Sequence, residues 1–512
     1  MKLSRLLLAV VHGLSVLLVL PRLAECTNIK VTNPSVGTLS GGSTTVSFDV
    51  TWNSSWRIST PPNNWDAAWV FVKFSKNGGN WAHASLNNSG HTMPAGLTSS
   101  NGYVDTSVAF NIATNPVVGV FVYRNADGAG TVTGNGVGLS WNYSQDGVSA
   151  SDTVAVQVFA VEMVYVSAGS FFAGDKATSL YSLRQGSLDN DPWYIGSENE
   201  ISTTDSVGNG SNAGETASLF YHPGGGDAAG AQYTIPAEFP KGYQAFYLMK
   251  GEISQGQWVA FFNSLSAAQK SARDITAATG KNSDGIVYRN NVSWSGSGDA
   301  TLPDQGSGAT YEAVAMNYIS WADVAAYLDW SGLRPMSELE FEKAGRGPYP
   351  AVAGEYPWGK VTVTQATSIS NAGKTSESAQ AGANCVYGNN ANVQGPMRVG
   401  AMAHIQVTRD GTGAGYYGVM DLGCNLIERC VSVGISSGRA LNGAKHGNGA
   451  LDASGDSNVS TWPGPSVDTA GYRGGSWLYG LDLVRLSDRS SAANTNQSRN
   501  QDSGGRGART AP

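Results

Sequence analysis

The sequence predicts an α+β protein in two parts: an all-β sandwich, followed by an irregular domain of short helices and long loops. Two patterns indicate this architecture. Over residues 27–160, apolar and polar residues alternate in short runs separated by Gly and Asn turns, as in paired strands. Over residues 161–512, helical spacing after a capping serine appears in three places, and glycine-rich loops separate these segments.

Residues 1–26 have the pattern of a secretory signal peptide. A positively charged start precedes the apolar run of residues 6–20, and residues 24–26 supply the small side chains that a signal peptidase reads. The run is shorter than the ~20 apolar residues that span a bilayer, so we expect no membrane-spanning segment. Lipid attachment to Cys26 is an alternative, but Glu25 directly before it argues against a lipoprotein. We therefore expect a protein that is secreted or held at the cell surface.

The strand pattern is clearest where Val46, Phe48, Val50 and Trp52 fall on one face of a half-buried strand. Further runs of this kind with turn residues between them predict an immunoglobulin-like sandwich over residues 27–160. No cluster of catalytic side chains occurs in it. One role open to this part is attachment to a cell envelope.

The second part contains three helices that each begin with a capping box, in which a serine and a polar residue three positions later cap each other. Before them, the stretch from about residue 176 to 232 is polar and rich in Gly, Ser and Asn, which predicts an irregular insertion. The capping pairs are Ser254 with Gln257, Ser320 with Asp323, and Ser337 with Glu340.

Charge excludes one class of partner. The formal net charge is −7 and no cluster of Lys and Arg occurs, whereas a protein that binds the phosphate backbone needs a basic face. We expect no nucleic-acid partner.

The cysteines limit the disulfides. If Cys26 leaves with the signal peptide, Cys385, Cys424 and Cys430 remain, so at most one internal disulfide forms and one thiol is left over. The sequence leaves the pairing open.

Six motifs in this order make the chain resemble the formylglycine-generating enzyme family, also called sulfatase-modifying factors. The resemblance implies an irregular domain related to the C-type lectin fold over residues 161–512. The motifs are MVYVSAGSFFAGD (163–175), FYLMKGEISQGQWVAFFN (246–263), AVAMNYISWADVAAYLDWSGLRPMSELEFEKAGRG (313–347), YPWG (356–359), GVMDLGCNLIERC (418–430) and YRGGSW (472–477).

The resemblance also implies where the family's chemistry would sit. Its enzymes oxidise a sulfatase cysteine with oxygen and copper, and they hold copper between two cysteines, five positions apart, just after RGGSWL. In this sequence those positions are Tyr479 and Val484, and neither side chain replaces the soft thiolate that copper(I) prefers. We therefore expect no bound copper. Oxygen-dependent formylglycine-generating activity on sulfatases remains the alternative to the ligand-binding function described below.

A structural Ca²⁺ is a further implication of the resemblance, in the block DLGCNLIER. Carboxylates of Asp421 and Glu428, with the backbone carbonyls of Cys424 and Leu426, would supply the hard oxygens that Ca²⁺ needs. A solvated turn is the alternative for these carboxylates. For Cys424 and Cys430 we expect a structural disulfide or buried thiols.

The chain is also similar to a non-enzymatic branch of this fold, the variable proteins of diversity-generating retroelements. In those proteins the segment between RGGSW and a terminal GFR-like motif is mutated and binds diverse ligands. This implies that residues 478–502 form a ligand-binding surface for an unidentified protein or glycan. A fixed polar loop and a structural role at the cell surface are the alternatives. The expected binding residues are Tyr479, Asp482, Arg485, Asn494, Asn496, Ser498, Asn500 and Asp502.

Overall fold

We analysed a computed structural model of the chain, which describes residues 28–103, 117–176, 178–185, 191–202, 219–220, 234–404, 408–465, 470–494 and 496–512. The expected signal peptide (1–26) and most of the expected polar insertion (176–232) lie outside the described residues. Within the described ranges, no helix is long and apolar enough to cross a membrane.

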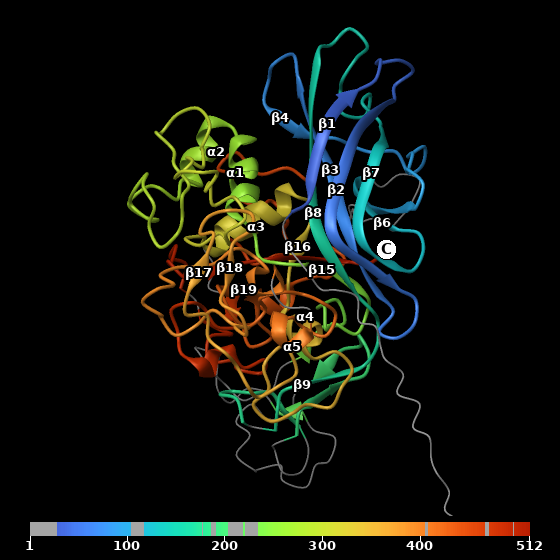
Figure 1. The fold of residues 1–512 in the computed structure, drawn as a ribbon. Helices are drawn as coiled ribbons and strands as arrows, with labels where there is room; N and C mark the ends of the chain where they lie inside the picture. The colour runs from blue at the N-terminus through green and yellow to red at the C-terminus, as the bar shows by residue number, and fades with distance from the viewer. Residues whose placement is uncertain are drawn as a thin grey trace, which may run out of the picture.

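The first part of the chain is rich in strands, as predicted (Figure 1). Its strands belong to one continuous sheet, which the pairing of the end of β2 with the start of β3 divides into two layers. In one layer β2 pairs antiparallel with β1 and β7, and in the other β3 pairs antiparallel with β6 and β8. Apolar side chains from both layers meet in one buried cluster. The strands are β1 (Lys30–Val36), β2 (Thr44–Ile58), β3 (Asn64–Lys76), β4 (Trp81–His83), β5 (Leu97–Tyr103), β6 (Val117–Arg124), β7 (Gly128–Trp141) and β8 (Val154–Val166).

Strand β3 is buried on both of its faces. Side chains on a strand point alternately to opposite faces, so Val70 and Val72 pack inside the sandwich while Trp69 and Phe71 pack against the second part of the chain. This explains why the sequence of β3 is a nearly continuous apolar run and not an alternating one. The sandwich therefore contributes one wall of the core of the second part.

The same sheet continues into the second part. Strand β8 pairs with β15 (Phe246–Met249), which pairs with β22 (Gly507–Thr510), which in turn pairs with β16 (Arg334–Pro335), all antiparallel. Residue 160, where the sequence suggested a domain boundary, lies inside β8. The strands of the two parts thus belong to one sheet, although each part has a core of its own.

Buried polar contacts also join the two parts. The ammonium group of Lys250, after β15, lies 3.1 Å from Glu162 and 3.7 Å from Asp66, and all three side chains are buried. The indole nitrogen of Trp69 donates to the carbonyl of Ser331 at 2.7 Å. Because buried charges are costly unless they are paired, these contacts favour one fixed arrangement of the two parts.

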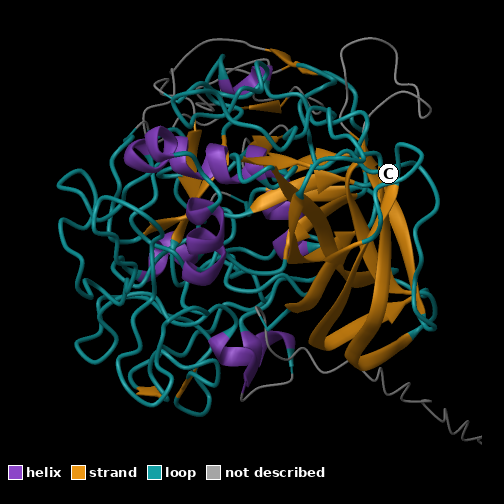
Figure 2. Cartoon of the chain, turned by 90° about the horizontal axis from the view of Figure 1, so that it is seen from above, coloured by secondary structure: helices purple, strands orange, loops and turns teal. Residues whose placement is uncertain are grey.

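The second part contains few helices, and loops make up most of it (Figure 2). All three predicted capping boxes are present. Trp258, Phe261 and Phe262 of the first helix are buried, as their helical spacing predicted. The helices are α1 (Gln255–Asn263), α2 (Ala267–Ala272), α3 (Trp321–Trp330), α4 (Glu338–Arg346) and α5 (Arg409–Thr412), with short 3-10 turns at Ala401–His404, Gly438–Ala440 and Leu481–Val484.

A small three-stranded sheet carries the C-terminal motifs. Its central strand β19 pairs antiparallel with β20, which contains the start of the RGGSW motif, and parallel with β21. The segment that the sequence singled out therefore leaves after β20 and returns at β21. These strands are β19 (Ile427–Val431), β20 (Ala470–Arg473) and β21 (Ser503–Gly504). The remaining short strands are β9 (Phe171–Ala173), β10 (Arg184–Gln185), β11 (Trp193–Ile195), β12 (Ile201–Ser202), β13 (Leu219–Phe220), β14 (Thr234–Ile235), β17 (Ile369–Ser370) and β18 (Ser378–Ala379).

Candidate binding surface

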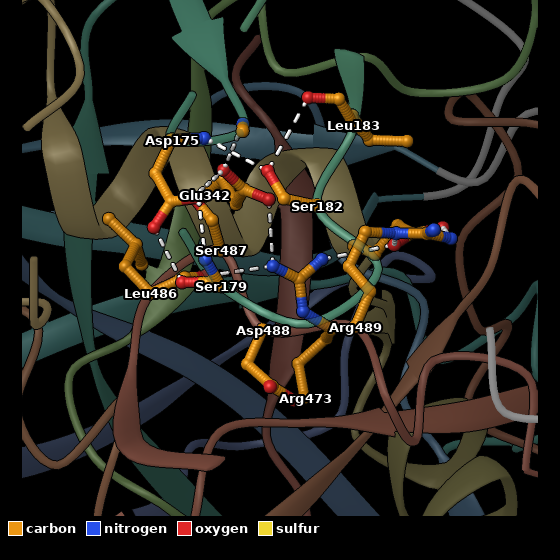
Figure 3. A network of polar contacts seen from close by, with 12 residues as sticks. Asp175, Ser179, Ser182, Leu183, Glu342, Arg473, Leu486, Ser487, Asp488 and Arg489 are labelled. Atoms are coloured by element: carbon orange, nitrogen blue, oxygen red, sulfur yellow. Dashed lines mark hydrogen bonds and ion pairs between the residues drawn. The ribbon is translucent and has the colours of Figure 1, made fainter. Parts of the chain in front are cut away.

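The first end of the C-terminal segment is anchored by a buried arginine. Arg473 in β20 donates to Glu338 at 3.0 Å and to Glu342 at 2.8 Å, both in α4. Arg489, from the middle of the segment, donates to the same Glu338 at 2.6 and 3.0 Å. Figure 3 shows this network around Glu342, Arg473 and Arg489. Charge-assisted bonds of this kind are among the stronger hydrogen bonds, so they hold both the start and the middle of the segment against α4.

The middle of the segment turns inward, which corrects the expectation of one continuous surface over residues 478–502. Ser487 donates to Glu342 at 3.0 Å and accepts from Arg346 at 2.8 Å (Figure 3). Apolar side chains of this stretch are in the core. The buried residues are Val484, Leu486, Ser487, Asp488, Arg489, Ala492 and Ala493.

Two exposed parts remain on either side of this buried stretch. The first lobe, residues 478–483, carries Tyr479, which is 46% exposed, and Asp482, whose side chain is 70% exposed. Arg485, just after it, is half-buried and lies 3.3 Å from Asp482. Such an exposed ion pair contributes little to stability, so both side chains remain available to a ligand.

The second lobe, residues 494 and 496–501, exposes Asn494, Asn496 and Ser498 and leaves Asn500 half-buried. The side-chain oxygen of Asn494 accepts from the backbone N–H of Asn496 at 3.0 Å, and that of Asn496 accepts from the N–H of Ser498 at 2.8 Å. Asparagine favours such turns because its side chain can bond the backbone two residues ahead. The two asparagines therefore shape the lobe locally as well as facing solvent.

The backbone of the second lobe is held from beneath through its carbonyl groups. Tyr472 donates to the carbonyl of Asn496 at 3.3 Å and the N–H of Tyr318 donates to that of Asn500 at 3.0 Å. The carbonyl of Gln501 accepts from the indole of Trp477 at 3.2 Å. None of these three bonds uses a side chain of the lobe itself. One side chain of the lobe adds to them: Arg499 donates to both carboxylate oxygens of Asp323 and to the carbonyls of Asp274 and Ala272. The path of the lobe is thus fixed by residues outside it together with Arg499.

The expectation that Asp502 lies at the surface is wrong. Its side chain is 4% exposed and accepts a hydrogen bond from Ser476 at 3.0 Å. Burial raises the pKa of Asp502, and the nearby charge of Asp502 raises the pKa of the Tyr479 phenol. Asp502 directly precedes β21 in the core, so it supports the surface and does not form it.

One exposed residue beside the second lobe was missed by sequence reasoning. Tyr288 is exposed, and its ring lies 5.1 Å from that of Trp477. Asn317 ties it to the lobe by donating to the carbonyls of Tyr288 at 3.1 Å and Gln501 at 2.8 Å. No local pattern could show this, because only the fold brings these segments together.

The positions of the family's copper-binding cysteines differ in environment. Tyr479 is exposed, whereas Val484 is buried beside the disulfide that joins Cys385 to Cys424. Cys430 is a buried free thiol whose pKa is raised by burial. A phenol and an isopropyl group provide no soft ligand, so these two positions do not fit a copper ion.

The two carboxylates expected to bind calcium are engaged by other groups. Both carboxylate oxygens of Glu428 accept from Arg506, each at 2.6 Å, and Asp421 accepts from the N–H of Gly400 at 2.7 Å. Among the residues that the structure describes, no group of three His, Cys, Asp or Glu side chains is placed to hold a metal ion. This donor set does not fit Ca²⁺ as it stands, and calcium binding stays a prediction.

Among solved structures, Treponema denticola variable protein 1 matches with 14% sequence identity over 69% of this chain and 96% of that chain, with a TM-score of 0.32. A TM-score this low does not establish a shared fold. No protein of curated function matches the chain.

A family comparison gives the clearer result. The profile of the Sulfatase-modifying factor enzyme 1-like domain matches residues 208–511, which is more than half of the chain. The match contains five of the six motifs, both lobes and the buried Arg473 and Arg489. The chain therefore belongs to the family of the Sulfatase-modifying factor enzyme 1-like domain.

Proposed function

We propose that this chain is a ligand-binding protein that presents two exposed lobes on a scaffold of the sulfatase-modifying factor type and carries no thiolate pair for copper. The observation that supports this most is the way the second lobe is held. Its backbone carbonyls accept hydrogen bonds from Tyr472, Tyr318 and Trp477, none of which belongs to the exposed surface. Exposed side chains there can change without removing these three contacts, although Asn494 and Asn496 each also bond the backbone of the lobe.

The composition of the lobes suits a protein or glycan ligand. Tyr479 offers a large contact area with few rotatable bonds, and Asn496 and Ser498 offer adaptable hydrogen bonds, as in antibody loops. Tyr288 lies beside them and extends the aromatic part of the surface. A surface of this kind can be diversified, as in the variable proteins of diversity-generating retroelements, and we include that diversification in the proposal.

Secretion or display at the cell surface is part of the same proposal. The disulfide between Cys385 and Cys424 supports it, because disulfides persist in oxidising, extracellular compartments. Attachment to a cell envelope through the sandwich is supported only by the edge strand β1, whose side chains are mostly exposed. Since the sandwich shares a sheet and buried ion pairs with the second part, an attached sandwich would present the lobes in a fixed orientation.

Two displayed libraries of the full chain test this proposal. The first randomises five exposed positions, and the second, a matched control, randomises five buried positions of the same segment. Both are sorted for folding by protease resistance and for binding to hen lysozyme and to a neutral oligosaccharide. The exposed positions are Tyr479, Asp482, Asn494, Asn496 and Ser498, and the buried positions are Val484, Leu486, Ser487, Ala492 and Ala493.

The first library is expected to remain mostly folded and to yield binders to at least one probe, whereas the second is expected to lose folding. Loss of folding in both libraries would show that the lobes are structural, and folded members without binders would argue for a fixed polar surface. Either result overturns the proposed function.

A further inference from the structure

Strand β8 leaves one of its two edges unpaired over most of its length. One edge pairs with β3 over residues 154–164. The other edge pairs with β15 only over residues 163–166, and one further backbone bond joins the N–H of Lys250 to the carbonyl of Glu162 at 2.9 Å. Among the residues that the structure describes, no strand or isolated bridge pairs with this second edge over residues 154–161. The edge is therefore open before Glu162.

The bond from Lys250 identifies which residues of β8 direct their backbone groups toward the open edge. In an antiparallel strand, the N–H and C=O groups of successive residues point alternately to the two edges. Glu162 points to the edge that faces Lys250, and no bulge interrupts the pairing of β8 with β3, so Ala160 and Val158 point to the same edge. Their N–H and C=O groups have no backbone partner in the described part of the chain. Such an unpaired edge is a template for another strand.

A cleft of about 710 Å³ lies along this open edge. Val158 and Ala160 line it from β8, and Gln257 and Ala260 line it from α1. Figure 1 shows β8 on the side of the sandwich that faces α1 and α3. The chain leaves the edge of β8 after Lys250 and then enters α1, which separates the two elements. The cleft therefore occupies the position next to β8 that β15 fills farther along the strand.

The walls of the cleft are largely apolar and partly aromatic. The Phe159 ring lies 5.3 Å from that of Phe71 and 4.9 Å from that of Trp330, and all three residues line the cleft. Among the described residues that line it, the only charged ones are Lys30 and Glu312, whose opposite charges cancel. Because side chains alternate along a strand, a strand paired with β8 places every second side chain against the aromatic wall. These walls suit an uncharged strand with apolar or aromatic residues at alternate positions.

We propose that this cleft is a second binding site, in which an extended and uncharged peptide segment of a partner protein adds as a strand to the open edge of β8. Main-chain groups of the peptide bond those of Val158 and Ala160, and its alternate side chains pack on the aromatic wall. At a rise of about 3.3 Å per residue, the edge over residues 154–160 accommodates a peptide of about six residues. None of the described residues of the two lobes lines the cleft, so this site does not rest on the function proposed for the lobes.

A displayed library of linear ten-residue peptides, selected on the full-length protein, provides the probes for this site. Ala260→Trp fills the cleft from a half-buried position on α1 and is expected to abolish binding of the selected peptides. Ala268→Trp is the matched control, because it adds the same side chain at an exposed position on α2 outside the cleft, and it should bind the peptides normally. Fluorescence anisotropy of labelled peptide measures the affinities.

A second measurement tests whether the bound peptide is a strand. One peptide that Ala260→Trp no longer binds is N-methylated at a single position at a time. Methylation at alternate positions is expected to weaken binding by about tenfold, because it removes an N–H that donates to a carbonyl of β8. Methylation at the positions between them should change the affinity little, since those N–H groups point away from β8.

Three results would overturn the proposal. The first is a selection that yields no peptide with measurable affinity. The second is a folded Ala260→Trp that still binds every selected peptide, which would place the peptides elsewhere on the protein. The third is an N-methylation profile without alternation, which would mean that side chains alone hold the peptide. Ser376→Trp narrows the cleft from a separate loop, so it decides the second point if Ala260→Trp does not fold.

Discussion

Three substitutions in the C-terminal segment separate its displayed side chains from its scaffold. Tyr479→Ala removes a side chain that is about half exposed, and Trp477→Ala removes one that is 1% exposed, two residues away. Asn496→Ala is intermediate, because its side chain is exposed but accepts a backbone hydrogen bond from Ser498. Residues 477 and 479 lie at the first lobe and residue 496 lies in the second lobe of the same segment. Differences in the free energy of unfolding between the three variants therefore reflect how far each side chain is buried and which hydrogen bonds it makes.

The expected magnitudes follow from these contacts. Truncation of a buried aromatic ring costs about 3–5 kcal/mol, and Trp477→Ala also removes a donor to the Gln501 carbonyl. Asn496→Ala loses one hydrogen bond, with a typical net contribution of about 0.5–1.5 kcal/mol. Exposed substitutions usually stay within ~0.5 kcal/mol, which is the expectation for Tyr479→Ala. The order of destabilisation is therefore Trp477, then Asn496, then Tyr479.

Urea unfolding followed by tryptophan fluorescence and by far-UV circular dichroism measures these changes in the free energy of unfolding. Agreement of the two probes is needed before one free energy is assigned to the transition. If Tyr479→Ala proves as destabilising as Trp477→Ala, the first lobe is part of the core and the display of ligand-binding side chains is refuted. Gly480→Ala is a suitable control, because a side chain added there meets open space.

Three further predictions concern copper, the disulfide and pH. Full-length protein supplied with copper(I), oxygen and a Cys-containing sulfatase peptide is expected to form no peptide aldehyde, because Tyr479 and Val484 offer no thiolate. Mass spectrometry measures the aldehyde. Stoichiometric copper binding together with conversion of the peptide would contradict this prediction. Replacing Cys385 and Cys424 together by Ser is expected to lower the free energy of unfolding by about 4 kcal/mol, because the disulfide closes a loop at a sequence separation of 39 and so restricts the unfolded chain. An unchanged midpoint of urea unfolding would argue against a stabilising bond. Burial raises the pKa of Glu338, but Arg489 and Arg473 outweigh it and hold that pKa at about 2, below the ordinary value of 4.5. Because this pKa is lower in the folded protein than in the unfolded chain, the ionised carboxylate stabilises the fold at pH values above 4.5. This stabilisation is lost as the pH falls from 4.5 toward about 2. Arg489→Met should therefore move acid unfolding to higher pH, and an unmoved transition would show that the pair contributes little.

Features fixed by neighbouring residues could be predicted from the sequence. The capping box of Ser254 and Gln257 needs only two residues three positions apart, and the structure contains it. The alternation around Phe48 and Trp52 correctly predicted a strand with one buried face. For the three cysteines that the structure describes, the count correctly predicted at most one disulfide and one thiol left over, here Cys430.

Features that depend on distant partners could not be predicted in this way. The burial of Asp502 depends on Ser476, which reaches it only because β20 and β21 flank the same strand. The contact of Tyr288 with Trp477 joins segments that no period in the sequence relates. No sequence pattern showed that Glu428 in β19 pairs with Arg506, because Arg506 lies in the distant connection between β21 and β22.

The buried arginine network on α4 explains how one segment can combine a fixed backbone with varied exposed side chains. Arg473 and Arg489 fix the start and the middle of the segment on α4, and the bond between Ser476 and Asp502 joins its two ends. Each lobe is therefore a short loop closed at both ends, which limits the conformational entropy that binding must overcome. A ligand surface built from such loops gains affinity from preorganisation. Side chains such as Tyr479 and Ser498, which make none of the bonds that fix the lobes, remain available for recognition.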